Sequence, residues 1–157
     1  MRTPIIGVMG PGDQATNADL QIAFQLGRQI ALAGWILLTG GRDAGVMEAA
    51  NQGAKQAGGL TIGILPTADF AQLSDAVDIP ILTDMGNARN AINVLSSQVI
   101  IACGMGAGTA SEVSLAIKTG KPVVLLNASL ESQTFFQTLA PDLVQVAANP
   151  ETAIALV

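Results

Sequence analysis

The chain has 157 residues, of which 50% are hydrophobic and 12% charged, so we expect one domain over 1–157 with a sizeable core and exclude a disordered chain. The net charge is −5 and the seven basic residues are scattered, which argues against nucleic-acid and membrane-surface binding. The absence of His excludes imidazole catalysis and His-ligated metal, so we predict no metal ligands in the protein. The single cysteine, Cys103, excludes an internal disulfide and favours a cytoplasmic location.

Short apolar runs alternate with helical patterns through the first half of the chain. The N-terminus is interpreted as a first strand and not as a signal peptide. Asn17 or Asp19 is the expected cap of the first helix. We predict strands at 4–9, 35–38 and 60–65, a short edge strand at 79–82, and helices at 17–33 and 46–56.

The second half continues the same alternation. A helix over 86–97 is expected to carry Ala88, Ile92 and Leu95 on one side. Further strands are predicted at 98–103, 122–126 and 143–146, with helices at 109–119, 132–139 and from about 150.

Continuous runs of Val, Ile and Leu between helices are typical of a parallel sheet that is covered on both faces. The sequence therefore predicts an α/β fold with a doubly wound parallel sheet, a Rossmann-like three-layer α/β/α domain. The expected order of its main strands is 3-2-1-4-5-6. The winding then reverses between strands 4–9 and 98–103, where ligands bind in folds of this kind.

Glycine-rich loops follow the two strands that flank this reversal. One is Gly10-Pro11-Gly12, and the other runs from Gly104 to Thr109. The free N–H groups of the helix that follows, and the positive end of its dipole, are suited to a phosphate. Glycines here also fit a tight turn with Thr109 as a helix cap, and the loop alone does not separate the two interpretations.

Further motifs make the sequence recognisable. They are G-G-x-x-x-G-V-M-E-A-A at 40–50, G-G-x-x-I-G-I-L-P at 58–66, R-N at 89–90 and G-x-G-T-x-x-E at 106–112. Their order over roughly 5–125 resembles the lysine-decarboxylase-like family, which includes the LONELY GUY cytokinin phosphoribohydrolases. Within it, the stretches 86–97 and 106–112 are similar to those of molybdenum cofactor carrier proteins.

This resemblance implies a non-catalytic carrier that binds, protects and delivers the molybdenum cofactor, a pterin with one phosphate and a molybdenum–oxo group. It also implies a homo-oligomer, dimer or tetramer, with molybdenum enzymes as possible acceptors of the cargo. The small residues of helices 46–57 and 86–97 would permit close packing of subunits. The cofactor-binding residues expected from the loops and the resemblance are Gly10, Gly12, Gly40, Gly41, Arg42, Gly45, Arg89, Asn90, Gly106, Ala107, Gly108, Thr109 and Glu112.

The alternative is a LONELY GUY-like nucleoside 5′-monophosphate phosphoribohydrolase. Its catalytic Arg and Glu match Arg89 and Glu112, but the Lys that follows the Arg is Asn90 here. A pyridoxal phosphate enzyme is not expected, because none of the three lysines falls at the loop edge. Two pairings stay open: Arg42 with a ligand anion or with Asp43, and Glu112 with Arg89 or with substrate.

Overall fold

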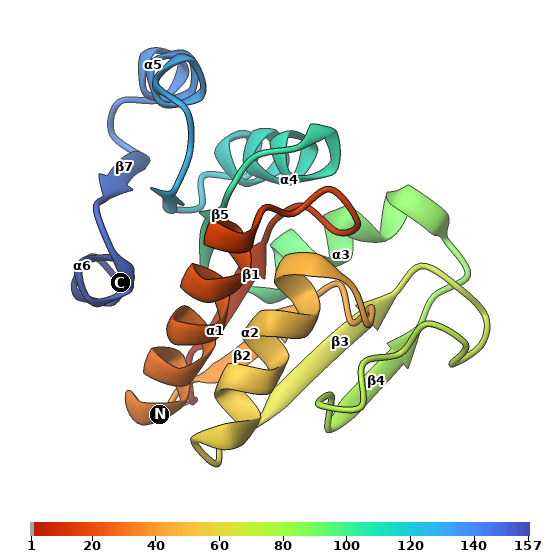
Figure 1. The fold of residues 1–157 in the computed structure, drawn as a ribbon. Helices are drawn as coiled ribbons and strands as arrows, with labels where there is room; N and C mark the ends of the chain where they lie inside the picture. The colour runs from red at the N-terminus through yellow and green to blue at the C-terminus, as the bar shows by residue number, and fades with distance from the viewer. Residues whose placement is uncertain (1) are drawn as a thin grey trace.

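The computed structural model describes residues 2–157, and its strands form a single sheet. The strands are β1 (Ile5–Met9), β2 (Ile36–Thr39), β3 (Thr61–Leu65), β4 (Ile79–Leu82), β5 (Val99–Cys103), β6 (Val123–Leu126) and β7 (Val144–Ala147). They lie in the order β4-β3-β2-β1-β5-β6-β7, and every neighbouring pair is parallel (Figure 1). The predicted order of the main strands is confirmed, with β4 added at one edge.

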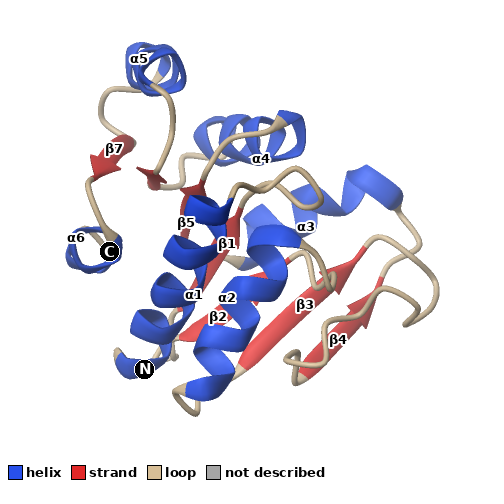
Figure 2. Cartoon of the chain, viewed as in Figure 1, coloured by secondary structure: helices blue, strands red, loops and turns tan. Residues whose placement is uncertain are grey.

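Helices cover both faces of the sheet (Figure 2). They are α1 (Asn17–Leu32), α2 (Gly45–Gln56), the 3₁₀ helix η1 (Gly86–Arg89), α3 (Asn90–Ser96), α4 (Ala107–Lys118), α5 (Leu130–Leu139) and α6 (Pro150–Ala155). One core joins α1, α2 and α6 to the sheet, and a second joins α3, α4 and α5 to its other face. This confirms the predicted three-layer architecture.

Strand β5 shows why the central strands have continuous apolar sequences. Its five residues are all buried, and successive side chains point to opposite faces. Ile101 and Cys103 therefore belong to the core under α1 and α2, whereas Ile100 and Ala102 belong to the core under α3 and α4. A strand buried on both faces has no polar side to alternate with.

The helix predicted over 86–97 is present in a different form. It begins as η1 and continues as α3, and the tighter 3₁₀ turn changes which side chains face inward. Of the three residues predicted to share one side, Ile92 packs against the core, whereas Ala88 is exposed and Leu95 is 62% exposed. Asn93 is fully buried in their place.

Two helix starts also differ from the predicted ones. Thr16, and neither Asn17 nor Asp19, caps α1: its hydroxyl accepts from the Asp19 amide at 3.1 Å, and the Asp19 carboxylate accepts from the Thr16 amide at 2.9 Å. Helix α4 begins at Ala107, with Gly106 in the cap position and no side-chain cap. Thr109 therefore lies inside the first turn, and the interpretation of Thr109 as a cap is wrong.

The reversal of winding lies between β1 and β5, where it was predicted. Gly7 of β1 pairs with Leu38 of β2 on one side and with Ile100 of β5 on the other. The loops after β1 and β5 therefore emerge side by side at the carboxyl edge of the sheet.

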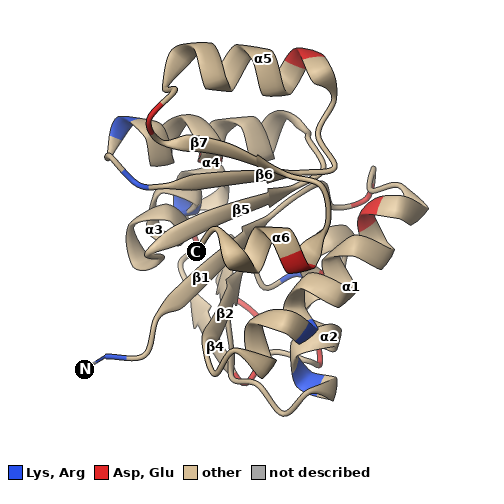
Figure 3. Cartoon of the chain, turned by 90° about the vertical axis from the view of Figure 1, so that its left-hand side faces the viewer, with Lys and Arg blue, Asp and Glu red and all other residues tan. Residues whose placement is uncertain are grey.

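In Figure 3 the basic residues are separated from one another along the ribbon. Within residues 2–157, no helix is long and apolar enough to cross a membrane.

Candidate functional site

Two adjoining cavities open at the carboxyl edge, at the switch between β1 and β5. The inner one has a volume of about 160 Å³ and the outer one about 350 Å³. Both are lined by Gly10, Arg42, Gly108 and Thr109, so the two form one continuous crevice. Of the other predicted residues, the inner cavity is lined by Gly40, Arg89, Asn90 and Glu112, and the outer one by Gly12, Gly106 and Ala107.

The first turn of α4 forms one wall of this crevice. Its first intrahelical bond runs from the Ala110 amide to the Gly106 carbonyl at 2.8 Å. The amides of residues 107–109 thus precede the helical ladder and have no intrahelical acceptor. The Thr109 side chain is 2% exposed, and its buried hydroxyl has no hydrogen-bond partner among the described residues. Unpaired donors beside a cavity are suited to an anionic or strongly accepting ligand group.

Arg89 closes the inner cavity from the opposite side. It lies at the end of η1, is 9% exposed, and its Nε has no hydrogen-bond partner within residues 2–157. Burial lowers the pKa of the Arg89 guanidinium, the nearby Arg42 adds to this, and Glu112 opposes it. Its guanidinium lies against Gly40, where a Cβ atom would overlap Nη1. Glycine at position 40 therefore leaves room for the close approach of the Arg89 guanidinium, which a larger residue would displace.

Glu112 lies one turn after Thr109 and lines the same cavity. The side chain is 6% exposed, and its Oε1 accepts a hydrogen bond from Asn93 Nδ2 at 2.9 Å. Burial raises the pKa of Glu112 to about 7, while the Asn93 hydrogen bond and the Arg89 charge act in the opposite direction. Within the described chain, Arg89 and Glu112 are not joined by a salt bridge; their coupling is through space.

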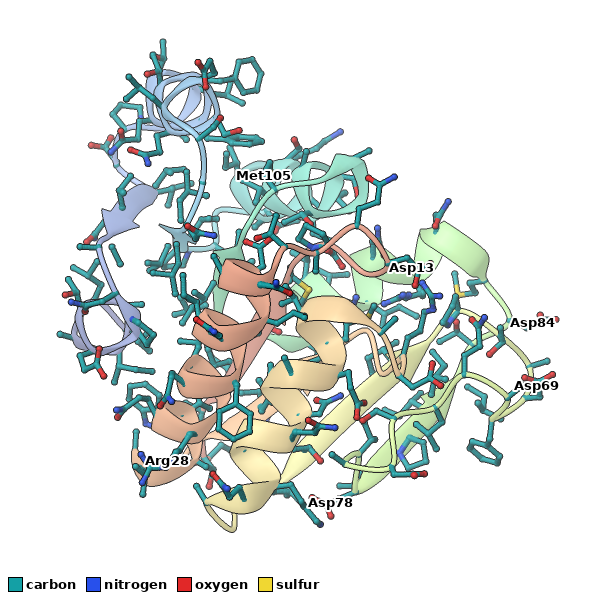
Figure 4. The ribbon with its side chains drawn as sticks, in the orientation of Figure 1. Asp13, Arg28, Asp69, Asp78, Asp84 and Met105 are labelled. Carbon is teal, nitrogen blue, oxygen red and sulfur yellow. The ribbon has the colours of Figure 1, made fainter. Side chains whose placement is uncertain are left out.

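Arg42 reaches the crevice from the loop after β2. Its Nε donates to Gln72 Oε1 at 3.2 Å, and its Nη2 lies 3.8 Å from Asp13 Oδ2. Asp13 lies in the loop that follows β1 (Figure 4). The pairing of Arg42 with Asp43, one of the two alternatives above, is not formed; instead the Asp43 amide donates to the Gln72 carbonyl at 2.9 Å.

Gly41 and Gly45 lie outside both cavities. Gly41 packs against Gly63 of β3, where an added Cβ would lie 3.0 Å from the Gly63 Cα. Gly45 has a φ of +55° at the start of α2, and a Cβ there would overlap the carbonyls of Pro11 and Gly12. In the structure, both glycines therefore have a packing reason of their own.

The sequence interpretation missed several side chains around the site. Asn93 donates to Glu112, Gln72 and Asp13 hold Arg42, and the apolar Met9 and Met47 line the inner cavity. A signal for Asn93 was present. Asn90, Asn93 and Ser97 recur at helical spacing and form a buried polar stripe, whereas the prediction considered only the apolar residues of this helix. The contacts of Gln72 and Asp13 depend on the tertiary fold and have no local signal.

The fold and the crevice define a Rossmann-like protein with a polar crevice at the switch point of its sheet. Residues 3–154 match the sequence model of the SLOG cluster4 family (LDcluster4). The chain belongs to this family. A cytokinin riboside 5′-monophosphate phosphoribohydrolase of Mycobacterium tuberculosis is 32% identical over 71% of this chain and 65% of its own length. These matches confirm the family resemblance predicted from the motifs.

Solved structures give a sharper comparison. The molybdenum cofactor binding protein of Rippkaea orientalis is 63% identical, with a TM-score of 0.98 over 99% of this chain and 96% of that one. The molybdenum cofactor carrier protein of Chlamydomonas reinhardtii is 58% identical, with a TM-score of 0.94 over 99% and 96% of the two chains. The predicted likeness to molybdenum cofactor carrier proteins is confirmed over the full length.

Proposed function

We propose that this protein binds the molybdenum cofactor as cargo, protects it and delivers it, without chemical change. The observation that carries the proposal concerns Thr109 and Arg89, two side chains that line one crevice beside the start of α4. Each has a buried polar atom without a hydrogen-bond partner among the described residues, Thr109 Oγ1 and Arg89 Nε. Leaving such groups unpaired costs roughly 1–3 kcal/mol each, which a bound anion removes. The names of the two similar proteins supply the identity of the ligand.

The phosphate of the cofactor is assigned to the outer cavity, on the amides of residues 106–109 and the Thr109 hydroxyl. Two guanidinium groups, Arg42 and Arg89, line the adjoining inner cavity and complement the negative charges of the ligand. We assign the pterin to the crevice toward the Gly40–Gly45 loop, where Asn90 also lines the wall. The residues present therefore fit a phosphate-bearing pterin.

Copurification tests the proposal. The chain is expressed in a host that makes the cofactor, purified, and oxidised so that any bound pterin becomes fluorescent. We expect a fluorescent pterin with the wild-type chain and with Arg28→Ala, whose side chain is on the exposed side of α1 (Figure 4), and strongly reduced fluorescence with Arg89→Ala. Wild-type protein without pterin, and without stabilisation by added cofactor, would contradict the proposal.

A second candidate function is hydrolysis of nucleoside 5′-monophosphates to base and ribose 5-phosphate. It is supported by the position of Arg89 and Glu112 on one cavity and by the phosphoribohydrolase relative. A buried carboxyl with a pKa of about 7 is suited to proton transfer near neutral pH. Release of free base by the wild-type chain, lost in Glu112→Ala, would establish this activity; equal release by both proteins would exclude the assigned role of Glu112.

We propose further that the chain acts as one unit over 1–157, in the cytoplasm, as a homo-oligomer that passes its cargo to molybdenum enzymes. Small residues line a groove of about 800 Å³ between α3 and α4, among them Ala88, Ala91 and Gly108, and permit close subunit packing. Sedimentation tests the assembly, and a purely monomeric protein would contradict it. Activation of a cofactor-free molybdenum enzyme by the loaded protein tests delivery.

A further inference from the structure

Two acidic residues line the crevice. Asp13 is exposed at the outer cavity, where it lies 3.8 Å from Arg42, whereas Glu112 is buried at the inner cavity. The inner cavity is otherwise lined by the cationic Arg42 and Arg89, and its wall contains the positive end of α4. Glu112 follows Thr109 by three residues on that helix, so both side chains lie on one helix face. An anion bound at the start of α4 therefore lies beside a buried carboxyl group.

The surroundings of Glu112 contain few other charges. From η1, Arg89 acts on it through space, and from the loop after β2, Arg42 acts on Arg89. Helix α3 contributes the neutral Asn93, and β6 has no ionisable side chain. Cys103, at the end of β5, belongs to the core on the opposite face, where its Sγ donates to the Asp19 carbonyl.

We propose that Glu112 is a specificity-determining residue. It takes up a proton when an anion occupies the seat, the anion site formed by the backbone amides of residues 106–109. The proposal rests on the proposed function and adds a proton to it. The carboxylate binds one proton from solvent and becomes a neutral carboxyl group, and no other bond forms or breaks. The seat then accepts a dianionic headgroup together with one proton.

Two physical reasons support this step. A second negative charge in a water-poor cavity disfavours the ionised carboxylate, so the anion and the Glu112 charge compete. The neutral carboxyl also gains an O–H donor, which a carboxylate lacks. Because Asn93 Nδ2 donates to Oε1, the proton is assigned to the other oxygen, Oε2. The pKa of Glu112 near 7 makes the cost of protonation small at neutral pH.

Sulfate is the probe of choice, because it stays dianionic between pH 6 and 8.5 and any proton taken up belongs to the protein. Calorimetric titration at pH 8 in two buffers of different ionisation enthalpy gives the number of protons bound. We expect about 0.4 proton per sulfate for the wild-type chain, since Glu112 is mostly ionised beforehand and a coupled rise of its pKa by about one unit leaves it half protonated at pH 8. We also expect sulfate affinity to fall about tenfold from pH 6 to pH 8.5, equal to one unit of coupled pKa shift.

Glu112→Gln keeps the shape of the side chain and the oxygen that accepts a hydrogen bond from Asn93. The melting temperature of this variant is compared with that of the wild type before binding is measured. We expect this variant to bind sulfate with no proton uptake and no dependence on pH. Glu131→Gln, on the exposed start of α5, is the matched control and should behave as the wild type. The wild-type proton count needs no variant at all.

The two proposals fail in different ways. If amide NMR signals of residues 107–109 shift with sulfate, but no proton is taken up and affinity is independent of pH, the role of Glu112 is overturned and the seat stands. If those signals do not respond to sulfate at any pH, the seat itself is wrong, and the proposed function loses its phosphate site. Proton uptake retained in Glu112→Gln would assign the proton to another group.

Discussion

Helices α2 and α4 both begin at the carboxyl edge of the sheet, after glycine-rich loops, and yet their first turns differ. At the start of α2, the Val46 amide donates to the Pro11 carbonyl at 3.0 Å, and Gly45 has no room for a Cβ. At the start of α4, an added Cβ on Gly108 would meet open space, and the amides of residues 107–109 have no intrahelical acceptor. One start is closed by the fold, and the other is open to a ligand.

This difference shows what a glycine cluster indicates. Glycine is needed at Gly45 because two backbone carbonyls lie against it and because φ is positive. At Gly108 no protein atom lies within 4 Å of an added Cβ, so the fold leaves space for a ligand to approach the backbone. The same motif can therefore mark packing or an open site, and the space beside the glycine separates the two cases.

The largest expected effect is a loss of stability from a substitution at the start of α2. Gly45→Ala should lower the free energy of unfolding by about 3 kcal/mol, because its Cβ overlaps two carbonyls in a left-handed backbone. Thermal or denaturant unfolding measures this. The matched control is Gly108→Ala, which should change stability by less than about 1 kcal/mol, since alanine is favoured over glycine within a helix. Equal losses in the two variants would remove the distinction between the helix starts.

The pH dependence of stability sharpens the contrast on the α4 side. Glu112 has an ordinary pKa of 4.5 and a folded pKa of about 7, so the folded state binds the proton more tightly. Its contribution is present below pH 4.5 and is lost as pH rises toward 7, by up to roughly 3 kcal/mol. Denaturant unfolding from pH 4.5 to 8 should show this fall. In Glu112→Gln the slope should be smaller, and an unchanged slope would assign it to other groups.

Arg89→Ala tests cofactor binding at the crevice beside the start of α4. We expect cofactor affinity to fall by about 2 kcal/mol, roughly 30-fold, because a buried guanidinium is removed from an anionic ligand. Stability without ligand should stay the same or rise, since the Arg89 Nε has no partner among the described residues. Fluorescence titration with the cofactor provides the measurement. The exposed Arg28→Ala is the control, and an equal loss of affinity in both variants would contradict a specific role for Arg89.

Thr109→Val gives the smallest expected effect. The change removes a hydroxyl that has no partner within residues 2–157 and keeps the shape of the side chain. Cofactor affinity should fall by about 1 kcal/mol, roughly fivefold, while the unliganded protein should be no less stable. Parallel binding and thermal unfolding measurements distinguish this from a structural role. A loss of stability without any loss of affinity would indicate that Thr109 serves the fold.

Much of the fold was accessible from the sequence, because its signals are local or topological. Buried strands such as β5 are continuous apolar runs, and the alternation with helices leaves few ways to order a parallel sheet. The η1–α3 segment was less predictable. Its polar stripe through Asn90 and Asn93 faces inward because Ser111 Oγ, 3.0 Å from Asn90 Nδ2, and Glu112 accept its hydrogen bonds. Such partners are brought together only by the tertiary fold.

The candidate site was predictable to a similar extent. The switch-point rule and the glycine loops located the crevice, and the family motifs pointed to Arg89 and Glu112. The sequence could not show that Arg89 and Thr109 have unpaired buried atoms, because burial and pairing are properties of the packed chain. Nor could it separate Gly45 from Gly108, since the difference lies in the distance to carbonyls of another loop.

The most direct test of the account is a crystal structure of the protein with the phosphate-bearing pterin bound. The account predicts the phosphate at the start of α4, within hydrogen-bond distance of the amides of residues 107–109 and of the Thr109 hydroxyl. A phosphate found at the start of α2, or a pterin bound away from Arg89 and the β1–β5 crevice, would contradict it.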